Sequence, residues 1–335
     1  MVAVPSSEKS LIRHIRELAK AKAVRPLRAG RQSTVALGIG DDTAILQVPV
    51  GHEVLITTDF SLEGVHFRRD WHPADSVGHR CLARGLSDIA AMGGTPVAAF
   101  LSLALPAKLP RAWVEGFLHG LLALAGEHGV TLAGGDTAQA PGGAEGKILA
   151  DIVVVGSAPR GEAVRRSGAR AGDAIYVTGR LGASAVVLDR LYRKENKSLN
   201  TKQHAEHFYP SPRVAVGRYL REKGISRAMI DLSDGLSTDL HHLCEESRLG
   251  AMVYEDRIPV ARGATLKQAL HGGEDYELLF TASPKRAVPA MIEGAPVTRI
   301  GEMQRSSAGV MIASGTGKSS RLQPLGWEHF TSRKR

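Results

Sequence analysis

The chain has 335 residues, enough for two domains of ordinary size, and 43% of its residues are apolar, so sizeable cores can be buried. No apolar run reaches the roughly 18 residues that a membrane span needs, and the N-terminal segment predicts an amphipathic helix with Leu11, Ile15 and Leu18 on one face rather than a signal peptide. The two cysteines, Cys81 and Cys244, predict neither a disulfide framework nor a zinc site, and a cytoplasmic location follows.

The net charge of +9 leaves two interpretations open. It could mark a nucleic-acid-binding protein, or a basic surface that aids solubility and steers anions. The second is favoured because the sequence lacks an aromatic RNA-recognition pattern, a helix-turn-helix signature and a zinc finger. We therefore expect no nucleic-acid partner and no membrane partner.

In the first half of the chain, apolar runs bounded by glycine and proline predict a mixture of strands and helices. In chain order we expect two strands within 34–60, each ending in aspartate, a helix over 73–93, a strand at 97–105, a helix over 110–127, a short apolar run at 130–133 and a strand at 148–156. The Gly- and Arg-rich stretch 156–173 then predicts a link between domains. The expected boundaries are 1–160 for an N-terminal α/β domain and 161–335 for a C-terminal α+β domain.

The second half predicts a similar mixture without a strict βαβ rhythm. We expect a strand at 174–179, a helix from about Gly182, a polar surface loop at 193–206, a helix after Pro212, a strand at 228–234, helices near 235 and over 266–270, a strand at 276–282, and then a further helix and two strands. This order favours an α/β (α+β) fold of two domains over a single barrel.

The aspartates are the most informative feature, because most of them lie at the end of an apolar run or beside glycine. They are Asp41, Asp42, Asp59, Asp88, Asp136, Asp231 and Asp234. An aspartate that follows a buried strand is expected at the rim of a sheet, where ligand sites commonly form. Several converging carboxylates would need cations, and oxygen ligands select Mg²⁺, Ca²⁺ or Mn²⁺ over zinc. The alternative for each single aspartate is a helix cap or a turn.

Two weaker motifs are better explained without ligands. The string GTGKSS at 315–320 resembles the end of a P-loop, but Ile312 stands where the pattern needs glycine, so we predict a polar turn. His241, His242 and Cys244 share a predicted helix without a second ligand pair, which favours surface or core residues over a zinc site.

Taken in order, a set of strings resembles the thiamine-monophosphate kinase family, in the superfamily shared with aminoimidazole ribonucleotide synthetase and selenophosphate synthetase. The strings are GIGDDTAIL, TTDFSLEGVHF, GLSDIAAMGGTP, GGDT, RSGA, DLSDGLSTDL, GGEDYELLF and GWEHF. The resemblance runs from about Leu37 to Phe330, and GVHF with GGEDYEL favours the thiamine phosphate branch. It implies a two-domain kinase of the aminoimidazole ribonucleotide synthetase-like fold, whose N-terminal domains pair their sheets in a homodimer.

The resemblance also implies residue roles. Several Mg²⁺ ions would be held by Asp42, Thr57, Thr58, Asp59, Asp88, Asp136, Asp231 and Asp234. ATP would contact Gly135, Asp136, Arg166 and Ser233, and thiamine monophosphate would contact His66, Glu274 and Trp327. Without the resemblance, we would interpret His66 as an ordinary core or surface histidine and Glu274 as a solvated turn residue. Trp327 would then be a residue that closes the C-terminal core.

The implied reaction fits this aspartate set. A phosphate monoester carries about −1.5 to −2 charges at neutral pH, so its oxygen is already a nucleophile and no catalytic side chain is needed as a base. The obstacle is repulsion between two polyanions, which several Mg²⁺ ions would offset. We expect direct transfer from ATP to thiamine monophosphate, giving thiamine diphosphate. The alternatives are another ATP-dependent member of the superfamily, of the aminoimidazole ribonucleotide or selenophosphate synthetase type, or a basic nucleic-acid-binding protein.

Overall fold

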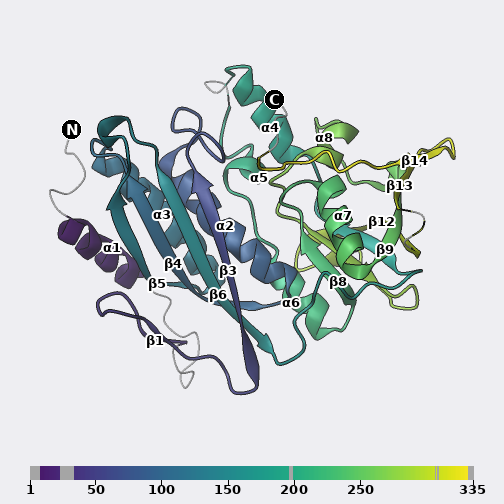
Figure 1. The fold of residues 1–335 in the computed structure, drawn as a ribbon, viewed down its shortest axis with the longest axis horizontal. Coiled ribbons are helices and arrows are strands. Elements are labelled where there is room, and N and C mark those ends of the chain that lie inside the picture. Colours follow the sequence, from purple (N-terminus) through teal and green to yellow (C-terminus); the bar gives the residue numbers. More distant parts are fainter. Residues whose placement is uncertain (1–7, 23–33, 196–198, 306, 308, 331–335) are drawn as a thin grey trace. The chain divides into compact units, whose positions relative to one another are not determined.

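The computed structural model describes residues 8–22, 34–195, 199–305, 307 and 309–330. It divides into two compact units (Figure 1). The first comprises Met1–Ile89 and Gly94–Gly161, and the second Ala90–Gly93 and Glu162–Arg335. Both mix helices and strands, so the predicted α/β (α+β) class is confirmed.

The first unit is built on a four-stranded sheet with the order β3-β6-β4-β5. Its strands are β3 His52–Leu62, β4 Thr95–Leu105, β5 Thr131–Gln139 and β6 Leu149–Pro159. β4 and β5 run parallel, and the other neighbours run antiparallel. The remaining elements are α1 Glu8–Lys22, β1 Val35–Leu37, β2 Ile45–Leu46, α2 Ala74–Ala91, α3 Arg111–His128 and the short helix η1 Gly143–Glu145.

Helices α2 and α3 lie against one face of this sheet (Figure 1). Glycines let them approach each other closely: a Cβ at Gly78 would lie 1.8 Å from the carbonyl oxygen of Phe117, and one at Gly120 would lie 1.9 Å from that of Asp75. The predicted amphipathic N-terminal helix is α1, with Leu11 and Ile15 buried. The helix face of the sheet is therefore the core side, while the opposite face carries exposed side chains.

The second unit contains an eight-stranded sheet with the order β14-β13-β9-β12-β7-β10-β8, to which β11 adds by pairing with β12. The strands are β7 Ala174–Thr178, β8 Ser226–Asp231, β9 Leu249–Tyr254, β10 Leu278–Ala282, β11 Met291–Ile292, β12 Ala295–Arg305, β13 Val310–Ala313 and β14 Ser319–Arg321. The helices are α4 Ala183–Tyr192, α5 Ala205–Phe208, α6 Val214–Glu222, α7 Leu236–Ser247, η3 Glu255–Arg257 and α8 Leu266–His271. Apolar residues of α7, including Leu236, Leu240 and Leu243, pack with those of the strands into one core.

Two predictions about elements are wrong. The strand expected to end at Asp59 does not end there, because β3 continues to Leu62, and the apolar run at 130–133 is the start of β5, which continues past Asp136 to Gln139. The backbone pairing of both strands continues beyond the aspartates. Because these strands are partly exposed, their residues after the aspartates do not have to be apolar, so the end of the apolar run does not mark the end of the strand. The helix expected after β10 is also absent from the described residues, because turns with Pro284 and Pro289 occupy 283–290.

Other expectations hold. The GTGKSS string forms a hairpin turn between β13 and β14, where Ser314 N–H donates to the carbonyl of Lys318 at 2.8 Å. The polar stretch 193–206 is largely irregular, and its residues 196–198 lie outside the described part. In the part of the chain that the structure describes, no helix combines the length and the apolar character that a membrane crossing requires.

Candidate functional site

Three of the expected metal ligands in the first unit meet on the helix face of the sheet. Thr57 and Asp59 are two residues apart on β3, so both point to the same face. The hydroxyl of Thr57 donates a short hydrogen bond to Oδ2 of Asp88 on α2. Asp59 also interacts with the Asp88 carboxyl through a side-chain hydrogen bond. We call Thr57, Asp59 and Asp88 the helix-face cluster.

The helix-face cluster concentrates negative charge in a poorly solvated place. Burial, and then the neighbouring Asp88 carboxylate, raise the pKa of Asp59 to about 7, although the Arg84 guanidinium opposes the shift. A carboxyl that ionises this reluctantly marks a position where a cation would offset the crowding. The donors are all oxygens, which fits Mg²⁺.

Thr58 points to the opposite face of the sheet, because it lies between Thr57 and Asp59 on the strand. Its hydroxyl donates to Oδ1 of Asp151 on β6 at 2.7 Å. Asp151 pairs with Ser102 on β4, and Ser102 pairs with Asp136 on β5. Asp136 and Asp151 therefore lie two strands apart, about 10 Å between backbones, in one cross-strand row on the face away from the helices.

The remaining expected residues of the first unit have different settings. Asp42 lies exposed in the segment between β1 and β2, where its N–H donates to Oδ1 of Asp41 at 2.9 Å. Gly135 has a φ of +149°, and a Cβ there would lie 1.9 Å from the carbonyl oxygen of Leu101. Close packing against β4 thus already requires glycine at 135.

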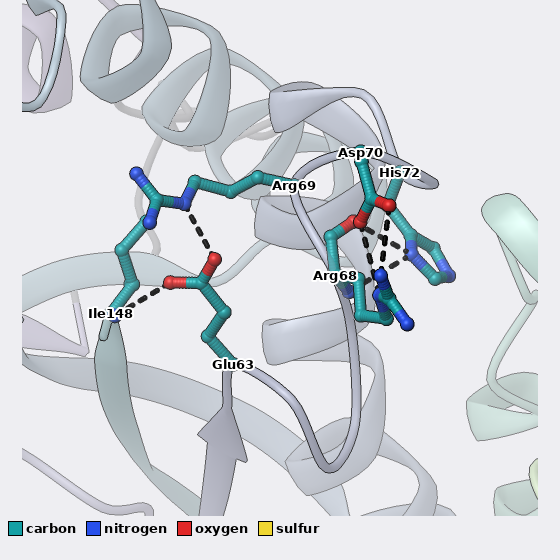
Figure 2. Close-up of polar contacts among 6 residues, drawn as sticks. All are labelled: Glu63, Arg68, Arg69, Asp70, His72 and Ile148. Atoms are coloured by element: carbon teal, nitrogen blue, oxygen red, sulfur yellow. Dashed lines mark hydrogen bonds and ion pairs between the residues drawn. The ribbon is translucent and has the colours of Figure 1, made fainter. Parts of the chain in front are cut away.

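His66 lies in a turn just after β3. Its Nδ1 accepts a hydrogen bond from the N–H of Leu62 at 3.0 Å, so a neutral ring carries its proton on Nε2. Glu63 fixes this turn: one carboxylate oxygen accepts from Arg69 Nε at 2.5 Å and the other from the N–H of Ile148 at 2.9 Å (Figure 2). The backbone around His66 is therefore closed on itself and tied to the start of β6.

Residues 68–72, which follow His66 in the same loop, are held by contacts among themselves. The guanidinium of Arg68 makes a two-point ion pair with Asp70, at 3.0 and 2.9 Å. The backbone N–H of Arg68 donates to Nδ1 of His72 at 3.3 Å (Figure 2). The guanidinium of Arg68 also lies 4.3 Å from the ring centroid of Trp71. These contacts define the course of 68–72 and leave His66 in a preset turn.

In the second unit, the segment Asp231–Asp234, here called the DLSD turn, joins the end of β8 to α7. The N–H of Glu274 donates to the carbonyl of Ser233 at 2.8 Å, and the N–H of Trp327 donates to the carbonyl of Asp234 at 2.9 Å. The structure thus brings together four residues that the sequence separates by up to 94 positions (233 to 327). They are Ser233, Asp234, Glu274 and Trp327.

Glu274 is held in an unusual backbone conformation, with a φ of +64°, and Tyr276 has a φ of +50°. Such values are costly for residues with a Cβ and persist only where the surroundings impose them. Between them, both carboxylate oxygens of Asp275 accept from the N–H of Gly182, at 3.1 and 2.9 Å. Burial raises the pKa of Asp275 to about 8. The strained segment is therefore anchored from inside the unit.

Glu277 supplies a second anchor for this segment. It accepts from Arg213 at 2.7 and 2.5 Å and from the hydroxyl of Thr178 at 2.5 Å. Trp327 is half-buried, and its indole N–H donates to Nε2 of His329 at 3.3 Å. It is therefore not a core residue of the unit. The backbone carbonyl of Arg166 accepts from the hydroxyl of Ser247 at 2.7 Å, which ties that segment to the end of α7.

Among the described residues, the only group of at least three metal-binding side chains with ligand atoms within 4.8 Å of one another is Asp234, Asp239 and His242. Asp239 is 2% exposed. Its Oδ2 accepts from the N–H groups of Asp234 and Gly235, at 3.1 and 3.0 Å. Burial, followed by the charges of Asp231 and Asp234, raises the pKa of Asp239.

Sequence reasoning missed Asp151, Asp239 and Asp275. Asp151 interrupts an apolar strand and Asp239 stands in the first turn of a helix directly after the DLSD turn, so both carried a signal in the sequence. The sequence signal for Asp275 was weaker, because this residue lies beside another acidic residue in a loop. Neither cysteine is a reactive thiol, because burial raises the pKa of Cys81 and that of Cys244 to about 12.

Comparison with known proteins identifies the family to which this chain is similar. Residues 40–158 match the family model for the AIR synthase related protein N-terminal domain, and residues 170–313 match the corresponding C-terminal domain. Thiamine-monophosphate kinase of Salmonella typhimurium is 38% identical over 313 residues, covering 89% of this chain and 93% of the relative.

Solved structures give the same result. The crystal structure of thiamine-monophosphate kinase from Stenotrophomonas maltophilia K279a matches with a TM-score of 0.76 at 31% identity, over 95% of this chain and 99% of the other. The structure of AaThiL complexed with AMPPCP and TMP matches with a TM-score of 0.74 at 29% identity, over 98% of this chain and 99% of the other. The chain belongs to the thiamine-monophosphate kinase family.

Proposed function

We propose that this protein transfers the γ-phosphoryl group of ATP to thiamine monophosphate and forms thiamine diphosphate, a step of thiamine diphosphate biosynthesis. The observation that carries the proposal is the helix-face cluster, where Asp59 and Asp88 crowd two carboxylates together and the pKa of Asp59 rises to about 7. A relative of the same fold binds AMPPCP, whose triphosphate chain resembles that of ATP, together with TMP.

We assign several Mg²⁺ ions to the oxygen-bearing side chains of the two units. In the first unit these are Asp42, Thr57, Thr58, Asp59, Asp88 and Asp136, and in the second they are Asp231 and Asp234. When bound, Mg²⁺ would neutralise phosphate charge and help to align the donor and acceptor. Asp151 joins this set as the partner of Thr58, whose orientation it fixes.

The chain's own polar groups would bind and orient the two substrates. Gly135, Asp136, Arg166 and Ser233 are assigned to ATP. His66, Glu274 and Trp327 are assigned to thiamine monophosphate, and two of these are held before any substrate arrives. The preset turn around His66 and the anchored backbone of Glu274 lower the ordering cost of binding.

No side chain is needed as a general base, because the acceptor phosphate is already ionised at neutral pH. Its oxygen attacks the γ-phosphorus, the bond from that phosphorus to the bridging oxygen breaks, and ADP leaves with the electron pair. A phosphorylated protein intermediate is therefore not expected.

The test is an assay with Mg·ATP and either thiamine monophosphate or free thiamine as acceptor. We expect thiamine diphosphate and ADP in equal amounts from the monophosphate, and no phosphorylated product from free thiamine. Activity with free thiamine and none with its phosphate would refute the proposal. Turnover of aminoimidazole or selenium substrates would instead favour the other members of the superfamily.

A homodimer formed through the sheet of the first unit is a further part of the proposal. On the face away from the helices, β3 presents Val54 at 48%, Ile56 at 69% and Phe60 at 60% exposure, and Leu149 of β6 adds 37%. An apolar row of this kind on a sheet marks an interaction surface. Replacing Ile56 with lysine should shift the mass found by light scattering toward the monomer. We also assign the protein to the cytoplasm, where ATP is made available.

A further inference from the structure

Asp239 occupies an unusual place for a carboxylate. It lies in the first turn of α7, is 2% exposed, and its side chain turns back toward the residues that precede the helix. Its Oδ2 accepts from the N–H of Asp234 at 3.1 Å and from the N–H of Gly235 at 3.0 Å. Gly235 is the residue at the N-cap position and has no side chain that could cap the helix. From inside the helix, Asp239 therefore satisfies the N–H of the N-cap residue and the N–H of the residue before it.

An uncharged hydrogen-bond acceptor at position 239 would serve the stability of the unit better than a carboxylate. A buried charge is costly, and two more carboxylates, those of Asp231 and Asp234, lie close to it. A capping side chain at 235 is excluded, because Gly235 has a φ of +112° and a Cβ there would lie 3.0 Å from the carbonyl oxygen of Gly272. The chain places its acceptor at 239, next to residues that we assign to metal binding.

The contact also completes the restraint on Asp234. The N–H of Asp234 is held by Asp239, and its carbonyl accepts from the N–H of Trp327 at 2.9 Å. On the other side of the turn, the carbonyl of Ser233 accepts from the N–H of Glu274 at 2.8 Å. With both backbone groups of Asp234 fixed, the direction of its Cα–Cβ bond is fixed as well. The carboxylate then keeps only its own side-chain rotations.

We propose that Asp239 is a positioning residue: by accepting from Asp234 and Gly235 it fixes the DLSD turn, so that the carboxylates of Asp231 and Asp234 are preorganised for Mg²⁺. Asp239 acts through the backbone of Asp234 and touches neither substrate. This inference rests on the proposed function, because it takes Asp231 and Asp234 as the metal ligands. Partners of this kind behind the ligands of a metal typically contribute about 10- to 100-fold to its affinity.

The test compares Asp239→Ala and Asp239→Asn with the wild-type protein by calorimetric titration with Mg²⁺, without turnover. We expect a Mg²⁺ dissociation constant about 10- to 100-fold higher for Asp239→Ala. Asp239→Asn should restore most of the affinity, because the amide oxygen can accept from the same two N–H groups. Were Asp239 itself a ligand, loss of its charge would leave Asp239→Asn with a Mg²⁺ affinity well below that of the wild type, which would overturn the proposal.

The matched control is Asp173→Ala. Asp173 is 1% exposed, accepts from the N–H of Arg170 at 2.8 Å and pairs with Arg227 at 2.6 Å, so it is also a buried carboxylate that holds a turn. The Asp173→Ala variant should lose thermal stability but keep the wild-type Mg²⁺ affinity. Equal losses of Mg²⁺ affinity in both alanine variants would refute a specific role for Asp239.

Two further outcomes decide the matter. If Asp239→Ala does not fold, Asp239→Ser takes its place, since its shorter side chain keeps a polar group but does not span both N–H groups. Failure of both to fold would assign Asp239 to the stability of the unit and overturn the proposal. Wild-type protein that binds no Mg²⁺ would refute the proposed function, whereas normal wild-type binding with unchanged affinity in Asp239→Ala would refute this inference alone.

Discussion

The helix-face cluster and the DLSD turn are both assigned to metal binding, but they are built differently. In the helix-face cluster, carboxylates from a strand and a helix crowd each other, and the pKa of Asp59 is raised to about 7. In the DLSD turn, backbone N–H and carbonyl groups are held by Asp239, Glu274 and Trp327. The first site depends on a cation to relieve repulsion, whereas the second is ordered before any cation arrives. One protein can thus prepare oxygen ligands either by crowding charges or by fixing a backbone.

Removal of one carboxylate from each site should give the largest effect and tests whether both are needed. Asp59→Asn and Asp231→Asn should each lower turnover by at least about 1000-fold, because metal ligation supplies several kcal/mol of transition-state stabilisation and each 1.4 kcal/mol is a factor of ten. Steady-state assays at saturating substrates measure this, with circular dichroism to verify folding. Near-normal turnover in either variant would remove that residue from the metal site.

The stability of Asp59→Asn without Mg²⁺ sharpens the account of the helix-face cluster. Asp59→Asn removes a crowded charge, so without Mg²⁺ it should melt at a temperature equal to or above that of the wild type at pH 8. Asp231→Asn likewise removes a charge close to the buried carboxyl of Asp239, but it leaves the backbone contacts that hold the DLSD turn in place. A metal-free Asp59→Asn protein that melts well below the wild type at this pH would show that the crowding is stabilising and contradict the account.

An intermediate effect is expected for Trp327, whose backbone holds the DLSD turn while its indole is half-buried. A cationic thiazolium ring over an indole gains roughly 0.5–2 kcal/mol. Trp327→Ala should therefore raise KM for thiamine monophosphate by about 2- to 30-fold, with little change in kcat or in KM for ATP. A sharp fall in melting temperature with equal shifts in both KM values would instead make the tryptophan a structural residue.

The smallest effect is a pH dependence of stability. The folded-state pKa of Asp59 is raised from 3.8 to about 7, so the unfolded chain loses this proton first as pH rises. The stabilising contribution is complete below about pH 4 and is lost by about pH 7. The melting temperature of metal-free wild type, relative to Asp59→Asn, should fall by a few degrees between pH 5 and pH 7 and level off above that. A difference that rises over this range would contradict the assigned shift.

The sequence predicted the fold class, the family and the chain positions of most carboxylates, because strand, turn and aspartate signals are local. It did not predict that Asp59 and Asp136 lie inside strands, nor that Thr57 and Thr58 point to opposite faces of the sheet. The partners of Thr58 and Glu274 lie 93 and 41 residues away in the chain, at Asp151 and Ser233. Such pairings are set by strand register and packing between distant segments, which no local pattern encodes.

The most direct test of direct phosphoryl transfer is a single-turnover experiment with ATP labelled at the γ-phosphate, an excess of the protein, Mg²⁺ and thiamine monophosphate. Quenched samples would be separated into protein, nucleotide and thiamine fractions over time. The account predicts that the label passes from ATP to thiamine diphosphate at one rate, with no labelled protein at any time. A labelled protein that forms first and then passes its label to thiamine monophosphate would contradict it.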